Sequence, residues 1–533
     1  MGIYKYGPYP KGEPQNYAQG NSDKGVKYRI YNIFKPSITL DELSVRAPDS
    51  ESKTQKIEDS ASLRYPLIKI NNYFLNEGEI DFMKIDSRDF LPTIILTVTF
   101  IHDVFISREF PKDGDIISLA IRNKSDVLNI IRNDYVITGV TVSRKNTILK
   151  GNITVTFFGE LFVPGLKSFL GTNSQNGTSM DVLKEAAKKL ELGFNTNETE
   201  TKDQQIWYCV DTLLDFIKEI TERSWKNENS FFRAWIDIYY NLNFVNVQKQ
   251  LLSSEDDVDI GAVINNIDKD RNWGSKVEEK YTKETPKVFS NFFGYRTTSF
   301  YITHWKPINR SSAITFQYGT SMTASFFEHI NSLYKDADSQ KYWNIEISPA
   351  YDKEKLDKYI LLRGRSTYNR EINEEELARA NYNYTELYKR SPWMGVQYTI
   401  TNVEEDNTKW TGNMHENYLR AQIHNTINNV EIEKLNVEIN VQGTNLNIIK
   451  GDKLPIVLIK KDRVENRLIN KNAKADAMID FFYTGWYYVK GYTISWTKKE
   501  SSIYSNFTQS YILTRREWPT PEPIDPIEKP EKT

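Results

Sequence analysis

The sequence contains very little cysteine, and its charges leave almost no net excess of either sign. Cys209 is the only cysteine among 533 residues, which excludes an intrachain disulfide and a cysteine-built zinc site. We expect Cys209 to be a small buried side chain rather than a nucleophile. The 69 Lys and Arg residues against 71 Asp and Glu give a net charge of −2, which disfavours partners selected by bulk charge, such as nucleic acid or an anionic membrane.

Long hydrophobic runs are also missing. The longest strongly apolar stretch, residues 93–101, is about half of what a membrane helix needs. Residues 1–6 lead into Pro, Gly and Asn rather than an apolar segment, which does not fit a signal peptide, and Tyr6 stands where myristoylation needs Ser or Thr. We therefore expect a chain that is not exported and has no membrane anchor.

The usual catalytic and metal-binding patterns do not occur. Residues 171–179 suggest a phosphate loop but have no Lys before Thr178, and a turn into a helix cap explains them better. The acidic residues Asp256, Asp257 and Asp259 lack the Gly and distal Glu of an EF-hand. No Gly-x-Ser-x-Gly elbow is present. The histidines are scattered and form no close pair: His102, His304, His329, His415 and His424. We therefore expect no catalytic, cofactor-binding or metal-binding residue.

The composition, 39% hydrophobic and 26% charged, is that of a folded protein too long for one core. The pattern predicts a mainly β, α+β chain with two related β-barrels, a small α/β domain and a mixed middle region. The expected divisions are an extended arm (1–63), a first barrel (64–165), the α/β domain (166–252), the middle region (253–430), a second barrel (431–518) and a Pro-rich acidic tail (519–533).

The two β-regions contain short β-branched and aromatic runs separated by turn residues. The expected strands are 67–70, 93–100, 116–121, 135–142 and 153–158 in the first region, and 435–441, 454–459, 485–495 and 507–513 in the second.

The region between them shows helical spacing. A helix capped by Thr178 or Ser179 places Leu183, Ala187 and Leu190 on one face and is expected to stop at Gly193. A second helix is expected over residues 213–224, followed by a strand that alternates over 232–240. In the middle region the spacing predicts helices over 321–334 and 374–388.

The most informative feature is an internal repeat. Residues 114–119, which begin Gly-Asp, are followed by residues 135–143, and residues 451–456, which also begin Gly-Asp, are followed by residues 487–495. The order and the residue classes match. Each copy closes with a further strand and a proline, Pro164 or Pro519. If three such chains form a ring, six similar barrels approximate six-fold symmetry while the rest of each chain keeps three-fold symmetry.

At these residues the sequence resembles the tail hub family of contractile injection machines, namely the late-control D proteins of phage, myophage baseplate hub proteins and the hub part of type VI secretion spikes. The strongest blocks are residues 177–197, 215–217, 230–240 and the end of the second barrel at 511–518.

The resemblance implies a structural baseplate hub with no active site. The expected partners are two further copies in a homotrimer, the central spike protein, and the tail tube and baseplate wedge proteins. DNA would pass through the lumen without being bound, and the protein would be part of the virion after assembly in the bacterial host cytoplasm. Two alternatives stay open: a tail adaptor that binds a receptor or glycan, and a peptidoglycan-cleaving tail hydrolase with a pair of carboxylates.

Overall fold

The computed structural model describes residues 66–100, 114–121, 131–144, 153–168, 173–252, 288–291, 300–310, 322–328, 342–347, 394–399, 415–459, 483–498 and 507–515, apart from isolated positions, together with residues 37–39 and a few single residues. Apart from residues 37–39 and Glu42, the expected arm lies outside this part of the chain. So do the helix predicted over 374–388, the acidic loop at 256–259, the Cys209 side chain and the Pro-rich tail.

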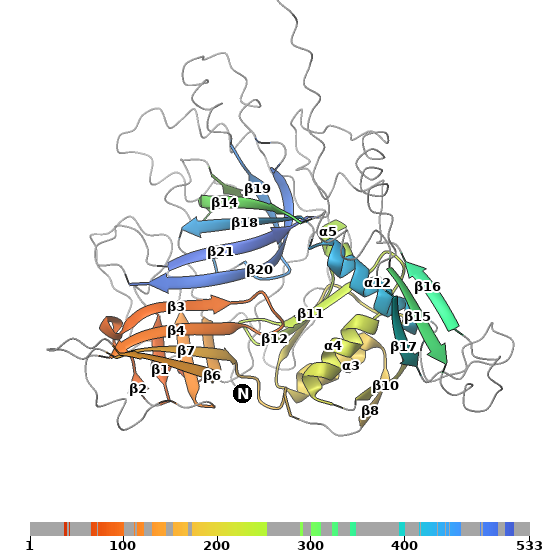
Figure 1. The fold of residues 1–533 in the computed structure, drawn as a ribbon, viewed down its shortest axis with the longest axis horizontal. Helices are drawn as coiled ribbons and strands as arrows, with labels where there is room; N and C mark the ends of the chain where they lie inside the picture. The colour runs from red at the N-terminus through yellow and green to blue at the C-terminus, as the bar shows by residue number, and fades with distance from the viewer. Residues whose placement is uncertain are drawn as a thin grey trace, which may run out of the picture.

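The fold is mainly β, and its centre is one curled 13-stranded sheet that contains both predicted β-regions (Figure 1). The strands from the first region are β1 (Leu67–Ile70), β2 (Tyr73–Phe74), β3 (Ile80–Asp86), β4 (Thr93–Phe100), β5 (Ile116–Ile121), β6 (Ile131–Arg144) and β7 (Ile153–Leu161). The others are β13 (Phe289–Ser290), β14 (Ile302–Asn309), β18 (Leu435–Gln442), β19 (Lys453–Val457), β20 (Gly485–Thr497) and β21 (Phe507–Thr514). We call these two sets the first and second β-units.

All nine strands expected in the two β-regions are present. Some alternate with one apolar face on the core, whereas others, such as β5 and β19, are buried along almost their whole length. β4 shows this alternation most clearly, with Ile94, Leu96, Val98 and Phe100 buried and the residues between them half-buried. The second β-unit is discontinuous in sequence, since β13 and β14 come from the stretch expected as the middle region. A boundary at residue 431 does not capture this.

The two β-units have the same strand order. β3, β4, β7, β6 and β5 are neighbours in that order, and β14, β18, β21, β20 and β19 follow the same order in the second unit. The pairing of β6 with β7 shifts register between Ile137 and Gly139, and that of β20 with β21 shifts between Val489 and Gly491. Both are bulges at equivalent positions.

Two further irregularities coincide. The β3–β4 pairing shifts after Ile80 and the β14–β18 pairing shifts after Ile302. Gly114 and Gly451 both have left-handed backbones, with φ of 92° and 97°. The N–H of each donates at 2.8 Å to the carbonyl of the residue before the bulge, Ile137 for Gly114 and Val489 for Gly451. The duplication predicted from the sequence is therefore present in the backbone.

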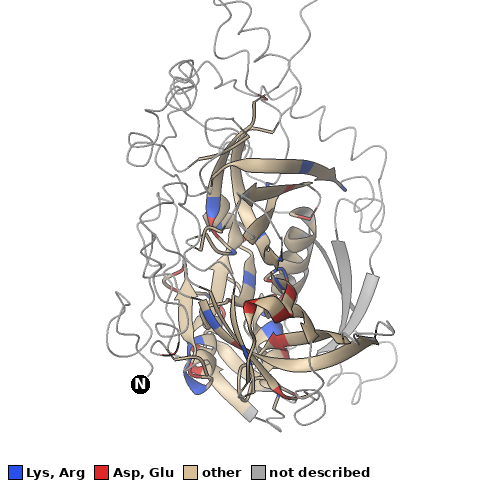
Figure 2. Ribbon diagram, turned by 90° about the vertical axis from the view of Figure 1, so that its left-hand side faces the viewer, with Lys and Arg blue, Asp and Glu red and all other residues tan. Residues whose placement is uncertain are grey.

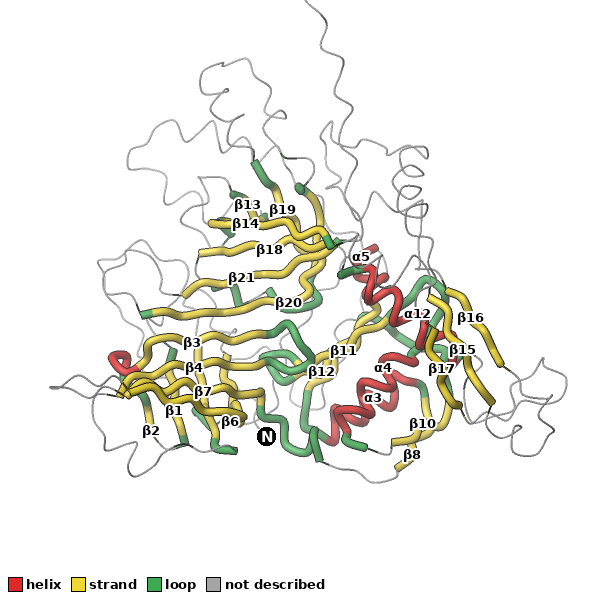
Figure 3. The backbone as a smooth tube through the Cα atoms, in the orientation of Figure 1, coloured by secondary structure: helices red, strands yellow, loops and turns green. Residues whose placement is uncertain are grey.

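A small α/β unit packs beside the sheet (Figure 3). It contains α3 (Ser179–Lys189), α4 (Leu213–Arg223) and α5 (Val247–Leu252), the three-stranded sheet of β9 (Gly193–Thr196), β11 (Phe232–Ile236) and β12 (Asn241–Asn246), and the pair β8 (Asn173–Gly177) and β10 (Gln205–Cys209). Later in the chain, α12 (Tyr418–Glu431) packs on α4.

The caps of the two predicted helices are confirmed, but one stop signal is not. Thr178 accepts the Asp181 N–H at 3.2 Å, and Thr212 caps α4 in the same way. The expected stop at Gly193 is wrong, because α3 ends at Lys189 and Glu191 takes the left-handed backbone, with φ of 56°. Gly193 instead starts β9.

Two expected elements in and beyond this unit were also wrong. The strand expected over 232–240 ends at Ile236, because Asp237 accepts hydrogen bonds from the Tyr239 and Asn241 N–H groups and turns the chain. Residues 322–328, expected in a helix, form strand β15 (Met322–Glu328). It pairs with β16 (Tyr342–Ile347) and β17 (Met394–Thr399), and pairing to two distant segments overrides local helical spacing.

Candidate functional site

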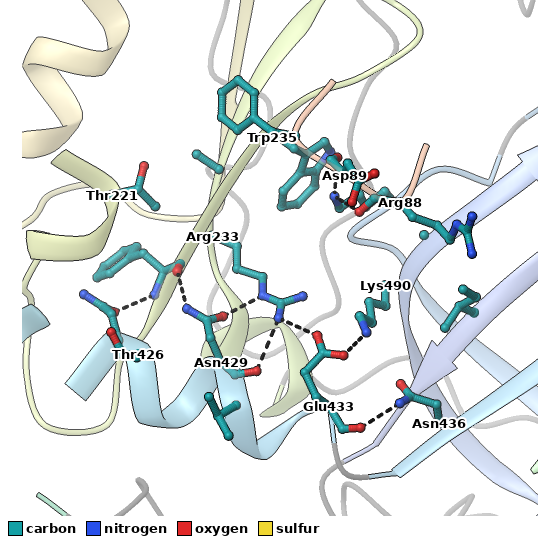
Figure 4. A pocket seen from close by; sticks show the side chains of 18 of the residues that line it. Arg88, Asp89, Thr221, Arg233, Trp235, Thr426, Asn429, Glu433, Asn436 and Lys490 are labelled. Carbon is teal, nitrogen blue, oxygen red and sulfur yellow. Dashed lines mark hydrogen bonds and ion pairs between the residues drawn. The ribbon is translucent and has the colours of Figure 1, made fainter. Parts of the chain in front are cut away.

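A charged cleft of about 830 Å³ lies where the two β-units meet the α/β unit (Figure 4). Its walls come from the loop after β3, from β11 with α4, from α12 with the residues after it, and from the second β-unit: the end of β14, the middle of β20, β21 and the turn before β19. Residues far apart in sequence therefore share one space. The charged lining residues are Arg88, Asp89, Lys218, Glu222, Arg233, Arg310, Glu433, Glu438, Lys450 and Lys490.

Glu433 is the anion at the centre of the cleft. Its carboxylate accepts from Arg233 at 3.1 Å and from Lys490, and Arg233 also donates to Asn429 on α12 (Figure 4). Burial alone would raise the pKa of Glu433, but Arg233 and Lys490 hold this pKa below its usual value. Since Arg233 is on β11 and Lys490 on β20, this ion pair network ties the α/β unit to the second β-unit.

Lys450 makes a second tie across the same junction. Its Nζ donates to the carbonyl oxygens of Arg88 and Asp89, both at 2.9 Å, and lies 5.2 Å from the ring centre of Trp235. The turn before β19 is thereby fixed to the loop after β3 and to β11. Burial, reinforced by nearby Arg233, lowers the pKa of Lys450 to about 7.

The lowered pKa of Lys450 gives a pH prediction. Between pH 7 and 10.5 the unfolded chain binds this proton more tightly than the folded chain, so the contribution of Lys450 to stability rises with pH. Between pH 7.5 and 8.5 the free energy of unfolding of the wild type should rise by about 1 kcal/mol relative to that of Lys450→Met. Denaturant titrations at both pH values measure this difference, and an unchanged difference would contradict the assignment.

The turn after β11 docks on both β-units. Asn133 on β6 donates to the Ile238 carbonyl at 2.6 Å, and the Asp134 N–H donates to the Tyr240 hydroxyl at 2.9 Å. On the other side, the Tyr239 hydroxyl donates to the Leu446 carbonyl at 2.9 Å. Three consecutive turn residues therefore fix the relative position of all three units.

The cleft is lined by charges of both signs. The basic groups at its centre are engaged by carboxylates or carbonyls, and acidic and basic residues are interspersed over the ribbon (Figure 2). Within the described ranges, no group of three His, Cys, Asp or Glu side chains lies close enough to hold a metal ion. No helix in that part of the chain is long and apolar enough to cross a membrane.

The residues considered from the sequence are spread over the molecule. Thr178 caps α3, as the turn interpretation of 171–179 predicts. His304 lies on β14, whereas His415 and His424 pack near Trp207 and Trp225, with ring centres 6.4 and 5.5 Å apart. His102 and His329 lie outside the described residues. The sequence analysis missed the cleft, although Lys490 lies inside the second copy of the repeat and Lys450 directly precedes that copy.

No family model matches the sequence, and no curated protein does. The fold is similar to solved tail proteins at low identity. A tail protein from Neisseria meningitidis is 9% identical over 84% of this chain and 95% of its own, with a TM-score of 0.39. The 43 kDa tail protein of a Shewanella oneidensis prophage is 8% identical over 85% and 98%, with a TM-score of 0.42. An E. coli component of the type VI secretion system is 10% identical over 85% and 79%, with a TM-score of 0.35.

Proposed function

We propose that this chain is a structural hub of a contractile phage tail baseplate, in which three copies form a ring between a six-fold tube and a three-fold spike. The observation that carries the proposal is the pair of equivalent β-units, which share strand order, two bulges and a left-handed glycine. Three chains supply six such units. A ring with three-fold symmetry can then present six similar binding surfaces to a partner with six-fold symmetry.

The junction cleft supports a mechanical role. The two β-units share one continuous sheet, and polar ties from Lys450, Glu433 and the turn after β11 hold the α/β unit against both. A load passed from one unit to another is therefore resisted by hydrogen bonds and buried apolar contacts rather than by a flexible linker. The proposed activity needs no bond-breaking chemistry, cofactor or metal.

The proposed partners follow from the ring. The tube would meet the six β-units, the central spike would meet the three-fold face, and wedge proteins would surround the ring. The lumen would let DNA pass during ejection without binding it, in keeping with the net charge of −2. The protein would be found in the virion after assembly in the host cytoplasm.

The mass of the purified chain by light scattering, alone and mixed with the candidate spike protein encoded nearby, tests the proposal. One chain has a mass of 62.2 kDa, and a species of three times that mass in either sample is the expected result. A monomer in both samples, with no complex, would refute the ring. Glycan-binding and peptidoglycan-cleavage assays would then test the two alternatives.

A further inference from the structure

The contact that joins the two β-units of one chain has an equivalent that is unpaired among the described residues. Residues Thr493–Thr497 of β20 pair with residues 82–86 of β3, and the two strands lie side by side in Figure 1. In the repeat, β6 corresponds to β20 and β14 corresponds to β3. Among the described residues, no strand pairs with β14 on the side away from β18, or with the C-terminal half of β6 on the side away from β7.

The shared bulges fix which residues are equivalent. Matching Gly139 to Gly491 places Thr141, Val142 and Ser143 where Thr493, Ile494 and Ser495 lie. Matching the β3–β4 pairing to the β14–β18 pairing places Lys306, Pro307 and Ile308 where Lys84, Ile85 and Asp86 lie. The two open edges therefore correspond, residue for residue, to the two edges that are already joined.

The exposure of one apolar side chain marks the open edge of β6. Val142 is 42% exposed, whereas Ile494 at the equivalent position is fully buried against the neighbouring unit. Both side chains belong to the core-facing set of their strands, opposite Val155 and Gln509. An apolar core position left in water at a strand edge is the feature expected where a further strand is added.

The bulge glycines show the same difference. A Cβ on Gly491 would lie 2.8 Å from the Arg88 Cα, whereas a Cβ on Gly139 would meet only Phe158, at 3.6 Å. Arg310, just after β14, is the equivalent of Arg88, just after β3. If a second copy packed on β6 as β3 packs on β20, its Arg310 would lie against Gly139 as Arg88 lies against Gly491.

We propose that the open edge of β6 pairs antiparallel with β14 of a second copy of this chain, with Thr141 opposite Ile308, Val142 opposite Pro307 and Ser143 opposite Lys306. The pairing repeats between chains the contact that joins the two β-units within one chain. It is head to tail, so that each copy uses β6 on one side and β14 on the other, and three copies close a ring. This inference rests on the proposed trimer and names the strands that close it.

The side chains brought together suit the contact. Val142 would lie opposite Pro307 and beside Trp305, as Ile494 lies opposite Ile85 and beside the buried Met83. Trp305 is only partly buried in the single chain. Adding the strand would therefore remove apolar surface from water on both edges, which is the main driving force for association.

Pro307 makes the contact between chains weaker than its internal equivalent. The Ser87 N–H donates to the Tyr492 carbonyl, and the Lys498 N–H donates to the Asp81 carbonyl. Hydrogen-bonded and non-hydrogen-bonded pairs alternate along antiparallel strands, so Ile494 and Ile85 form a pair joined by two backbone hydrogen bonds. Pro307 has no N–H, and the Val142–Pro307 pair keeps one of these two bonds. A proline on an exposed edge also limits pairing with wrong partners before assembly.

Disulfide cross-linking tests the register. Ser495 and Lys84 form a non-hydrogen-bonded pair, whose Cβ atoms are close enough for a disulfide, and Ser143 with Lys306 of a neighbour is its equivalent. The test chain carries Ser143→Cys and Lys306→Cys. Ser495→Cys with Lys84→Cys is the positive control within one chain, and Ser143→Cys with Lys84→Cys is the negative control because the β3 edge is already occupied. The parent chain, with Cys209 alone, gives the background.

The oligomeric form found by light scattering, alone or with the spike protein, is oxidised and separated without reductant. We expect covalent dimers and trimers from the test chain at tenfold or more above the negative control, and an intrachain bond only from the positive control. A trimer by mass that forms no cross-link, while the positive control does, would overturn the strand pairing and leave the proposed function standing. A chain that is monomeric under both conditions would overturn both.

Gly139→Ala provides a second readout. In this arrangement the added methyl group meets Arg310 of the next copy, so the dissociation constant of the oligomer should rise by about tenfold while the separated chain folds normally. Unchanged assembly of this variant would contradict the pairing.

Discussion

Gly491→Ala should lower the free energy of unfolding by about 3 kcal/mol, because the added methyl group has no room. The Cβ would lie 2.8 Å from the Arg88 Cα and 2.9 Å from its Cγ. Because one of these atoms belongs to the backbone of the neighbouring unit, the clash cannot be relieved by a side-chain rotation alone. The loop that receives Lys450, and with it the junction cleft, would have to shift. Denaturant unfolding of the purified chain measures the loss.

Gly139→Ala is the matched control, since it makes the same change at the equivalent position of the other β-unit. Its Cβ would meet only the Phe158 side chain, at ordinary contact distance. We expect a loss of under about 0.5 kcal/mol when both variants are compared at concentrations where the chain is monomeric. Equal losses from both glycines would show that the bulge conformation, and not the approach of Arg88, sets the requirement for glycine.

Glu433→Ala should cost about 2 kcal/mol. It leaves Arg233 and Lys490 close together in the cleft without the anion between them, and removing one partner of a buried ion pair typically costs about 3–5 kcal/mol. We expect less than this because the Glu433 side chain is 32% exposed, so water screens part of the interaction. Chemical unfolding at neutral pH measures the change.

The pH dependence of this loss identifies its cause. Since the folded pKa of Glu433 lies below its ordinary value of 4.5, the stabilisation by Glu433 is fully present above that pH and is lost as pH falls through the folded pKa. The wild type and Glu433→Ala should therefore converge in stability in acid. Glu433→Gln, which can keep hydrogen bonds but not the charge, should lie between them. Glu160→Ala, which removes an exposed pair with Lys167, is the control and should cost under about 1 kcal/mol. A pH-independent loss would point to packing instead.

The strands that could be predicted from the sequence are those whose apolar residues alternate without interruption, such as β4 and β18. β3 and β14 were missed for one physical reason: a bulge after Ile80 and another after Ile302 break the period-two pattern that marks a strand. Pro307 further lowers the strand signal of β14, although a proline is compatible with the edge position that this strand occupies.

The helix expected over 321–334 failed for a different reason. Phe326, Ile330 and Leu333 have helical spacing, but Met322–Glu328 pairs with strands that start about 20 and 70 residues further along the chain. Pairing with strands so far along the chain cannot be recognised from the residue pattern of the segment itself. The same holds for the cleft, where Lys450 is buried by Trp235 and by the loop of Arg88 and Asp89, none of which is near it in sequence.

The sequence by itself determined the mainly β class, the helix caps and the internal duplication, because these depend on patterns of residues close together in the chain. The tertiary structure decided how the two copies differ. β20 pairs with β3, and this contact buries Ile494 and leaves no room for a side chain at Gly491. The equivalent Val142 and Gly139 of β6 have no such neighbour among the described strands. Equivalent sequences acquire different environments because burial depends on which unit lies alongside, and local sequence does not specify that.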